Sequence, residues 1–270
     1  MIYFPHCKIN LGLLVTKKRT DGYHDIETVF YPVGMQDALE FVEANEFHFD
    51  LSGIELNGNP NDNLVVKAYR LLQADYKLPT IQIHLHKNIP SGAGLGGGSA
   101  DAAVMLTALN DYFKLNISTE KLIDYALHLG SDCPFFINPN PSLAVGRGER
   151  LTPVNINLKD YCLVVVKPPI HVSTAKAYGF MQPNKPEQSL AELISLPIEQ
   201  WKGQILNQFE DYVFETHPEV ADIKKQLYSL GADFSLMSGS GSAVFGLFKK
   251  TPCLEGEFPM SYHIFKQILN

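Results

Sequence analysis

The sequence lacks long apolar runs and has little positive charge. No apolar stretch in its 270 residues reaches the length of about 18 that a membrane-spanning helix needs. It does not begin with a basic segment followed by an apolar one, so we expect no signal or transit peptide. Its 22 Lys and Arg stand against 29 Asp and Glu, and the net charge of −7 argues against a general nucleic-acid binder. We therefore expect a cytoplasmic protein that binds neither nucleic acid nor membranes.

Cysteine is also scarce. The chain has four cysteines, and they form no C-x-x-C pair: Cys7, Cys133, Cys162 and Cys253. Scattered single cysteines are typical of reduced thiols in a cytoplasm, whereas disulfide frameworks and structural zinc sites need recurring spacings. We predict neither a disulfide nor a zinc site.

Glycine is concentrated in one segment. Five of the fifteen residues from Ile89 to Ala103 are glycine, and apolar residues with helical spacing follow, at Ala102, Met105, Leu106, Leu109 and Phe113. A glycine loop that enters a helix leaves backbone N–H groups without intrahelical partners. Those groups, together with the helix dipole, favour a bound phosphate. The segment therefore predicts a phosphate-binding loop.

The segment does not match either of two common phosphate-binding motifs. A P-loop needs a Gly-Lys pair, which the chain lacks. Gly92, Gly94 and Gly97 supply the letters of the G-x-G-x-x-G dinucleotide fingerprint. However, the next segment, Thr119 to Leu129, has a helical pattern where that fold requires a second parallel strand, and no acidic residue follows at the expected distance. The context argues against a Rossmann dehydrogenase.

Strand and helix patterns mix along the chain without regular alternation. Ile9, Leu11 and Leu13 alternate with Lys8, Asn10 and Gly12, and further strand patterns lie near residues 47–51, 81–85 and 161–166. Residues 64–73 have a helical pattern that begins after the capping residues 61–63. The irregular order predicts an α+β fold. We place a domain boundary near residue 150, which gives domains 1–150 and 151–270.

The glycine loop resembles the central motif of the GHMP kinases, in which proline precedes Gly-Leu-Gly, small residues and a helix. Its Gly-Gly-Gly-Ser ending is similar to the branch that phosphorylates 4-diphosphocytidyl-2-C-methyl-D-erythritol, although Ala100 stands where that branch usually has a second serine. The resemblance implies that ATP contacts Pro90, Gly92, Gly94, Leu95, Gly96, Gly97, Gly98, Ser99 and Asn63.

Two further segments match motifs that carry the chemistry of this branch. Lys8-Ile9-Asn10-Leu11 resembles its first motif, and Gly130-x-Asp132-x-Pro134 resembles the segment with its catalytic acidic residue. The resemblance implies that Asp132 accepts the proton of the substrate hydroxyl and that Lys8 stabilises the charge of the transferring phosphoryl group. The residues alone also permit an exposed sheet lysine and an N-cap at Asp132, and the N-cap is compatible with catalysis.

The remaining motifs concern the alcohol substrate. Asp21-Gly22-Tyr23-His24 has the composition of a turn, and in this branch the same residues hold a cytosine base. The resemblance assigns substrate contacts to Asn10, Tyr23, His24, Tyr178, Gly239 and Ser240. Gly239 and Ser240 lie in a second glycine cluster, residues 238–242, that also fits an ordinary hairpin. His84 and His86 alternate on a strand and are interpreted as exposed residues without a ligand.

These motifs occur in the order of the family. They imply two α+β domains with an active site in the cleft between them, ATP and Mg²⁺ as cofactors, and transfer of the γ-phosphoryl group to the 2-hydroxyl of the alcohol in non-mevalonate isoprenoid precursor synthesis. We expect a small-molecule substrate and a monomer or weak homodimer, and we assign no metal ligand. The alternatives are a GHMP kinase for mevalonate or homoserine and a nucleotide-binding module without catalysis.

Overall fold

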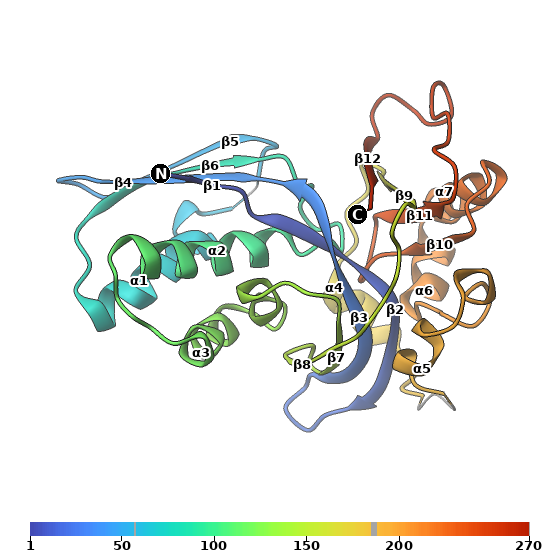
Figure 1. Ribbon diagram of the computed structural model, residues 1–270, viewed down its shortest axis with the longest axis horizontal. Coiled ribbons are helices and arrows are strands. Elements are labelled where there is room, and N and C mark those ends of the chain that lie inside the picture. Colours follow the sequence, from blue (N-terminus) through green and yellow to red (C-terminus); the bar gives the residue numbers. More distant parts are fainter. Residues whose placement is uncertain (57, 185–187, 270) are drawn as a thin grey trace. The chain divides into compact units, whose positions relative to one another are not determined.

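The computed structural model describes residues 1–56, 58–184 and 188–269. The chain forms two compact units, and each is assembled from separated segments (Figure 1). Unit 1 comprises residues 1–8, 32–91 and 96–140, and unit 2 comprises residues 9–31, 92–95 and 141–270. Both units mix helices and mainly antiparallel sheets, so the predicted α+β class is confirmed.

Unit 1 consists of one sheet and helices on one of its faces (Figure 1). The strand order is β1-β4-β6-β5, and only β5 and β6 run parallel. The strands are β1 (Ile2–Tyr3), β4 (Ala38–Glu43), β5 (His48–Gly53) and β6 (Ile81–Lys87). The helices are η1 (Pro60–Asp62), α1 (Leu64–Tyr76), α2 (Gly97–Tyr112), α3 (Thr119–Leu129) and η2 (Cys133–Ile137). The helices predicted at 64–73, after the glycine loop and at 119–129 are thus confirmed.

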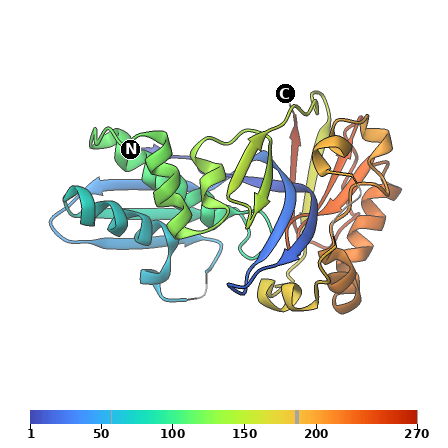
Figure 2. The same ribbon diagram turned by 90° about the horizontal axis from the view of Figure 1, so that it is seen from below.

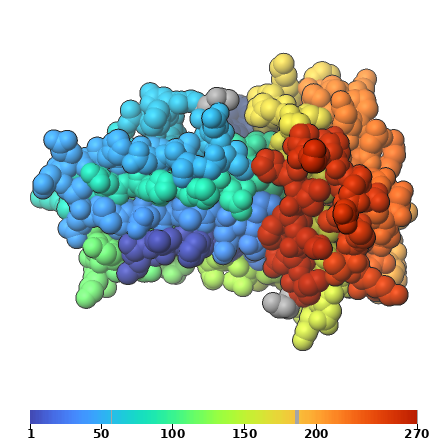
Figure 3. All heavy atoms as spheres, turned by 90° about the horizontal axis from the view of Figure 1, so that it is seen from above, coloured from blue at the N-terminus to red at the C-terminus, as the bar shows by residue number. Residues whose placement is uncertain are grey.

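The exposed positions of β6 are polar. β6 alternates buried and exposed residues, and its exposed positions are Gln82, His84 and His86. Figure 3 shows this side of the sheet, with residues 38–53 in blue and residues 81–87 in blue-green. The Ser52 hydroxyl lies 2.8 Å from His84 Nε2 and 3.0 Å from His86 Nδ1. No group of three metal-ligating side chains occurs among the described residues. The interpretation of both histidines as exposed sheet residues is confirmed.

Unit 2 contains two sheets of four strands, in the orders β2-β3-β7-β8 and β10-β11-β9-β12. The first comprises β2 (His6–Lys18), β3 (His24–Gln36), β7 (Ser142–Gly146) and β8 (Arg150–Pro153), although β2 begins and β3 ends in unit 1. The second comprises β9 (Cys162–Lys167), β10 (Phe234–Met237), β11 (Val244–Phe248) and β12 (His263–Ile268). The remaining helices are α4 (Thr174–Phe180), α5 (Leu190–Ile194), η3 (Ile198–Gln200), α6 (Phe209–Thr216) and α7 (Pro218–Ser229).

A single core joins early and late segments of the chain in unit 2. Helix α7 packs on β10 and β11 (Figure 2), and its Val220 and Leu227 are fully buried. Leu13 of β2 and Val164 of β9 belong to the same buried cluster. This packing fixes the β10–β11 hairpin, which carries the second glycine cluster at its turn.

Strand β2 differs from the prediction in one respect. Both of its faces are buried, and Lys8 and Asn10 are only 3% and 1% exposed. The edge of β2 is also paired, because Leu13 exchanges backbone hydrogen bonds of 2.9 Å with Leu206 and Gln208. A lysine on an exposed sheet face is therefore wrong for Lys8.

All four cysteines are free thiols, as predicted. Of the helices in the described part of the chain, none combines the length and apolar character of a membrane span. The sequence predicted a division at a single point near residue 150. In the structure the chain passes between the two compact units after residues 8, 31, 91, 95 and 140. Domains 1–150 and 151–270 stay a proposal.

Candidate active site

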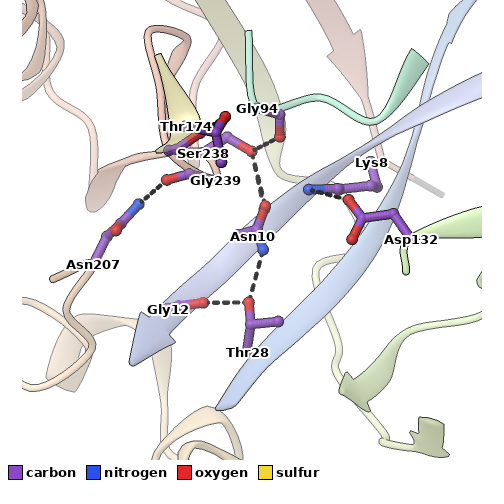
Figure 4. A network of polar contacts seen from close by, with 11 residues as sticks. Lys8, Asn10, Gly12, Thr28, Gly94, Asp132, Thr174, Asn207, Ser238 and Gly239 are labelled. Carbon is purple, nitrogen blue, oxygen red and sulfur yellow. Dashed lines mark hydrogen bonds and ion pairs between the residues drawn. The ribbon is translucent and has the colours of Figure 1, made fainter. Parts of the chain in front are cut away.

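Lys8 and Asp132 form an ion pair in unit 1 (Figure 4). Lys8 Nζ lies 3.5 Å from Asp132 Oδ2, and the two side chains are 4% and 33% exposed. The lysine is thus enclosed in the protein, while its carboxylate partner remains accessible to a substrate. A buried ammonium group attracts a carboxylate, so the ion pair keeps the Asp132 side chain turned toward Lys8.

Asp132 stands between two helices, as the motif suggested. Gly130 ends α3, and η2 begins at Cys133 with Pro134 in its first turn. The expectation that the Asp132 side chain caps this helix is wrong, because it makes no capping hydrogen bond. The carboxylate turns to Lys8 instead, where a full opposite charge binds it more strongly than a backbone dipole does.

The glycine loop brings the start of α2 close to Lys8. Gly96 adopts the left-handed conformation (φ 71°) directly before α2, and no side chain caps the helix. A Cβ atom on Gly96 would lie 3.2 Å from Lys8 Cε and 3.0 Å from Phe136 Cζ. Gly97, Gly98 and Ser99 are not buried, so their backbone N–H groups can meet an anion. Unit 1 therefore combines a helix N-terminus, a lysine and an accessible carboxylate.

Ser99 connects this helix to the Asp132 segment. Burial raises the pKa of the neighbouring Cys133 thiol to about 12, and a hydrogen bond with the Ser99 side chain partly opposes that rise. Cys133 is consequently a neutral thiol and no nucleophile at physiological pH. Ala100, where the family usually has serine, is fully buried, so its side chain is inaccessible to a ligand.

In unit 2, Asn10 lies within a network that includes both glycine segments (Figure 4). The Asn10 backbone N–H donates to Ser238 Oγ at 3.2 Å, and the Asn10 amide donates to Thr28 Oγ1 at 2.8 Å. The Ser238 hydroxyl donates to the Gly94 carbonyl at 2.8 Å. The network fixes the first glycine loop against the second glycine cluster.

The two glycine segments approach too closely for any side chain. A Cβ atom on Gly94 would lie 1.9 Å from the Ser238 carbonyl oxygen, and one on Gly239 would lie 2.8 Å from Gly94 Cα. Both glycines also have positive φ, of 76° and 57°. Only glycine satisfies the backbone conformation and the contact at once. Residues 238–242 thus lie at the turn of the β10–β11 hairpin, as that alternative expected, and this turn packs closely against Gly94.

Asn207 and Glu210 form hydrogen bonds with the backbone at the start of the second glycine cluster, and neither was predicted from the sequence. The buried Asn207 amide donates to the carbonyls of Met237 and Gly239 at 2.7 and 2.8 Å (Figure 4). Glu210 Oε1 accepts from the Met237 N–H at 2.9 Å. Ser240 lies at the tip, where its hydroxyl is 2.9 Å from Thr174 Oγ1. No local sequence pattern distinguishes these contacts from an ordinary helix start.

Two of the predicted substrate residues, His24 and Tyr178, form an aromatic cluster in unit 2, and Tyr23 directly precedes His24. The His24 and Tyr178 rings stack with centroids 5.1 Å apart and 23° between their planes. The Tyr23 ring is exposed, and the guanidinium carbon of Arg147 lies 5.0 Å from its centroid. Burial lowers the pKa of His24, with the positive charge of Lys18 acting in the same direction, so the imidazole is neutral at pH 7. Arg147, which the sequence analysis missed, adds a positive charge beside these rings.

Comparison with known proteins supports one family over most of the chain. The model of the GHMP kinase N-terminal domain matches residues 63–138, and that of the GHMP kinase C-terminal domain matches residues 189–252. A protein of Bacteroides fragilis strain YCH46, named 4-diphosphocytidyl-2-C-methyl-D-erythritol kinase, is 53% identical over 252 residues and 92% of each chain. The chain belongs to the GHMP kinases.

Solved structures of GHMP kinases have the same fold. A 4-(cytidine 5'-diphospho)-2C-methyl-D-erythritol kinase superposes with a TM-score of 0.77 at 34% identity, covering 92% of this chain and 90% of that one. The mevalonate kinase of Methanococcus jannaschii gives a TM-score of 0.70 at 13% identity and covers 100% and 98% of the two chains. The second likeness establishes the fold alone.

The other nucleotide residues predicted for this GHMP kinase have structural contacts of their own. Asn63 caps α1 through its side-chain oxygen, which accepts from the Val65 N–H at 2.9 Å. Leu95 and Pro90 are buried, so their side chains do not face a ligand. A Cβ atom on Gly92 would lie 2.7 Å from His171 Nδ1. Nucleotide contact by these residues stays a prediction.

Proposed function

We propose that this GHMP kinase transfers the γ-phosphoryl group of ATP to the 2-hydroxyl of 4-diphosphocytidyl-2-C-methyl-D-erythritol. The observation that carries the proposal is 53% identity over 92% of the chain to a kinase of that name. The Lys8–Asp132 pair beside the open N-terminus of α2 supports the same chemistry. Such sites work mainly by positioning and charge stabilisation.

The reaction assigns a separate task to each group in unit 1. The alcohol oxygen attacks the γ-phosphorus, the bond between that phosphorus and the β–γ bridging oxygen breaks, and ADP leaves. The hydroxyl proton passes to the accessible Asp132 carboxylate. Lys8 and the backbone N–H groups of residues 97–99 offset the negative charge on the transferring group. Because Lys8 is buried, its charge is poorly screened by solvent.

Mg²⁺ is the expected companion of ATP. Among the described residues no three ligating side chains form a cation site. This fits Mg²⁺, which proteins usually bind through substrate phosphates and one or two carboxylates instead of a protein cage. Asp132, which is 33% exposed and paired with Lys8, is an accessible carboxylate that could take part. When bound with ATP, Mg²⁺ would neutralise charge on the phosphate oxygens.

We assign the cytosine of the substrate to His24, Tyr23 and Tyr178. An aromatic side chain covers a pyrimidine face, and a neutral imidazole offers both a donor and an acceptor to the polar edge of the base. The stacking of His24 on Tyr178 holds the two rings ready for this task. Arg147 beside Tyr23 would add attraction for the diphosphate.

A GHMP kinase for mevalonate or homoserine is the second candidate, because those enzymes share the fold. The aromatic cluster speaks against it, since neither alcohol carries a base. In accordance with the family resemblance, we further propose action in the cytoplasm, in isoprenoid precursor synthesis, as a monomer or weak homodimer.

An assay of ADP release with ATP and Mg²⁺ tests the proposed function. 4-Diphosphocytidyl-methylerythritol, mevalonate and homoserine are offered separately, and we expect turnover on the first alone. The phosphorylated product is identified by phosphorus NMR. Turnover on mevalonate or homoserine would retain the kinase and refute the cytosine assignment. Lack of turnover on all three would refute the proposed reaction.

Replacement of Tyr178 tests the cytosine assignment separately. We expect Tyr178→Ala to raise the KM for the cytidine-bearing alcohol about 5- to 100-fold, the equivalent of the 1–3 kcal/mol that base stacking on an aromatic ring contributes. The KM for ATP should stay near the wild-type value. Phe180→Ala is the matched control, because Phe180 is an exposed aromatic residue of the same helix. Equal effects of the two substitutions would contradict the assignment.

A further inference from the structure

Unit 1 contains a buried ionic cluster that the proposed reaction does not use. Lys87 at the end of β6, Asp37 before β4 and Asp101 in α2 are 3%, 1% and 2% exposed. Lys87 Nζ donates to Asp101 Oδ2 at 2.7 Å and also to Asp37 Oδ2. Removal of a charge from water costs several kcal/mol even in a real protein interior. Burial of three such groups in one place therefore costs more free energy than apolar packing at the same positions would.

The cluster contacts both ends of the glycine loop. At the first end, Asp37 Oδ1 accepts from the backbone N–H groups of Asn88 and Ile89 at 2.6 and 2.8 Å. At the other end, Asp101 lies just after the first turn of α2, the helix whose N-terminus faces the expected phosphates. Lys87 joins the two carboxylates. A Cβ atom on Gly97 would lie 3.4 Å from Lys87 Nζ, so the start of α2 packs directly on the cluster.

The charges in the cluster also bear on anion binding. Burial raises the pKa of Asp101 to about 7, although the Lys87 ammonium opposes that rise. Asp101 Oδ1 is buried without a hydrogen-bond partner among the described residues. Without Lys87, two carboxylates would lie beneath the loop and repel a phosphate. The Lys87 ammonium therefore both joins the loop ends and offsets part of the negative charge there.

We propose that Lys87, Asp37 and Asp101 are positioning residues that hold the glycine loop, residues 88–101, in its ATP-binding conformation. This inference rests on the proposed use of ATP. The cluster acts through the loop backbone and touches neither the alcohol nor the reacting atoms. Its loss should therefore weaken ATP binding selectively, whereas a merely structural cluster would lower stability and leave the KM values alone.

The experiment compares Asp101→Asn and Lys87→Met with wild type. Asp101→Asn keeps the shape of the side chain, and folding of each variant is checked by thermal melting. Calorimetry with MgADP measures nucleotide binding without an alcohol, and steady-state kinetics give the KM for ATP and for the alcohol. We expect both the Kd for MgADP and the KM for ATP to rise on the order of 10- to 100-fold, because displacements of about 1 Å at a site have effects of this size. The KM for the alcohol should be nearly unchanged.

Tyr125→Phe is the matched control in the same unit. It removes the hydrogen bond from the Tyr125 hydroxyl to Asp75, far along the chain from the loop, and should lower the melting temperature alone. Folded variants at Asp101 and Lys87 with wild-type affinity for MgADP would overturn the cluster's role and leave the proposed function intact. Failure of the wild type to bind MgADP would instead overturn the use of ATP, and the inference with it.

Discussion

Replacement of Asp132 by asparagine is expected to lower kcat about 10²- to 10⁴-fold, the usual contribution of a positioned general base. Asparagine has the shape of aspartate but cannot accept the hydroxyl proton. The KM for ATP should change little, because the open N-terminus of α2 and the glycine loop remain. The measurement is ADP release with the cytidine-bearing alcohol, together with a thermal melt that confirms folding.

Two further variants show whether the loss of kcat comes from the base itself. Asp124→Asn removes an exposed carboxylate from α3 and should retain wild-type turnover. Lys8→Met should also lower kcat. The kcat of the double variant with Asp132→Asn should be no lower than that of the less active single variant, since the two residues act as one unit. Full activity of Asp132→Asn would refute the assignment of the base.

The second large effect is expected from Gly94→Ala. The new methyl group would meet the Ser238 carbonyl at 1.9 Å, and the backbone would keep a left-handed conformation that alanine disfavours. Overpacking and strain together should cost on the order of 3–5 kcal/mol in the free energy of unfolding. For a chain of this size, that loss lowers the melting temperature by roughly 10 °C. Calorimetric melting measures it, and MgADP binding should be lost because the loop must move.

Gly203→Ala separates the two causes. Gly203 has a similar φ of 81°, but a Cβ atom there would have no neighbour within 4 Å. Its substitution should cost only about 1 kcal/mol, from the left-handed backbone alone. If both variants melt at the same temperature, then the close approach of the two glycine segments is not important for stability.

The motifs predicted local structure well because each has a local cause. The helix after the glycine loop contains the stripe of Ala102 and Met105, although it starts earlier, at Gly97, and the helix over Thr119–Leu129 has the predicted bounds. Asn63 caps α1 through its side chain, as its residue type indicates. The sequence also indicated Lys8 and Asp132 as the candidate catalytic residues, and the structure brings their side chains within 3.5 Å of each other.

The residues that were missed depend on contacts distant in sequence. Asn207 reaches the carbonyl of Gly239 across 32 residues, and Asp37 reaches Asn88 across 51. No window of helical or strand spacing contains such pairs. Lys87 did leave a signal, because it occupies an inward position of the alternating strand β6, after Leu85. A charged residue in a core position predicts a buried partner, although it does not say which one.

The exchange of segments between the two units has a consequence for synthesis on the ribosome, because segments of one unit are made at very different times. Residues 9–31 are the first segment of unit 2 to emerge, yet Leu13, Val15 and Ile26 pack in a core with residues of β9, α6, α7 and β11, the last of them Phe248. More than 200 residues must therefore follow before these apolar strands are fully covered. Unpaired strands exposed for that long invite aggregation. A nascent chain that stalls before Phe248 is therefore expected to aggregate more readily than the complete chain.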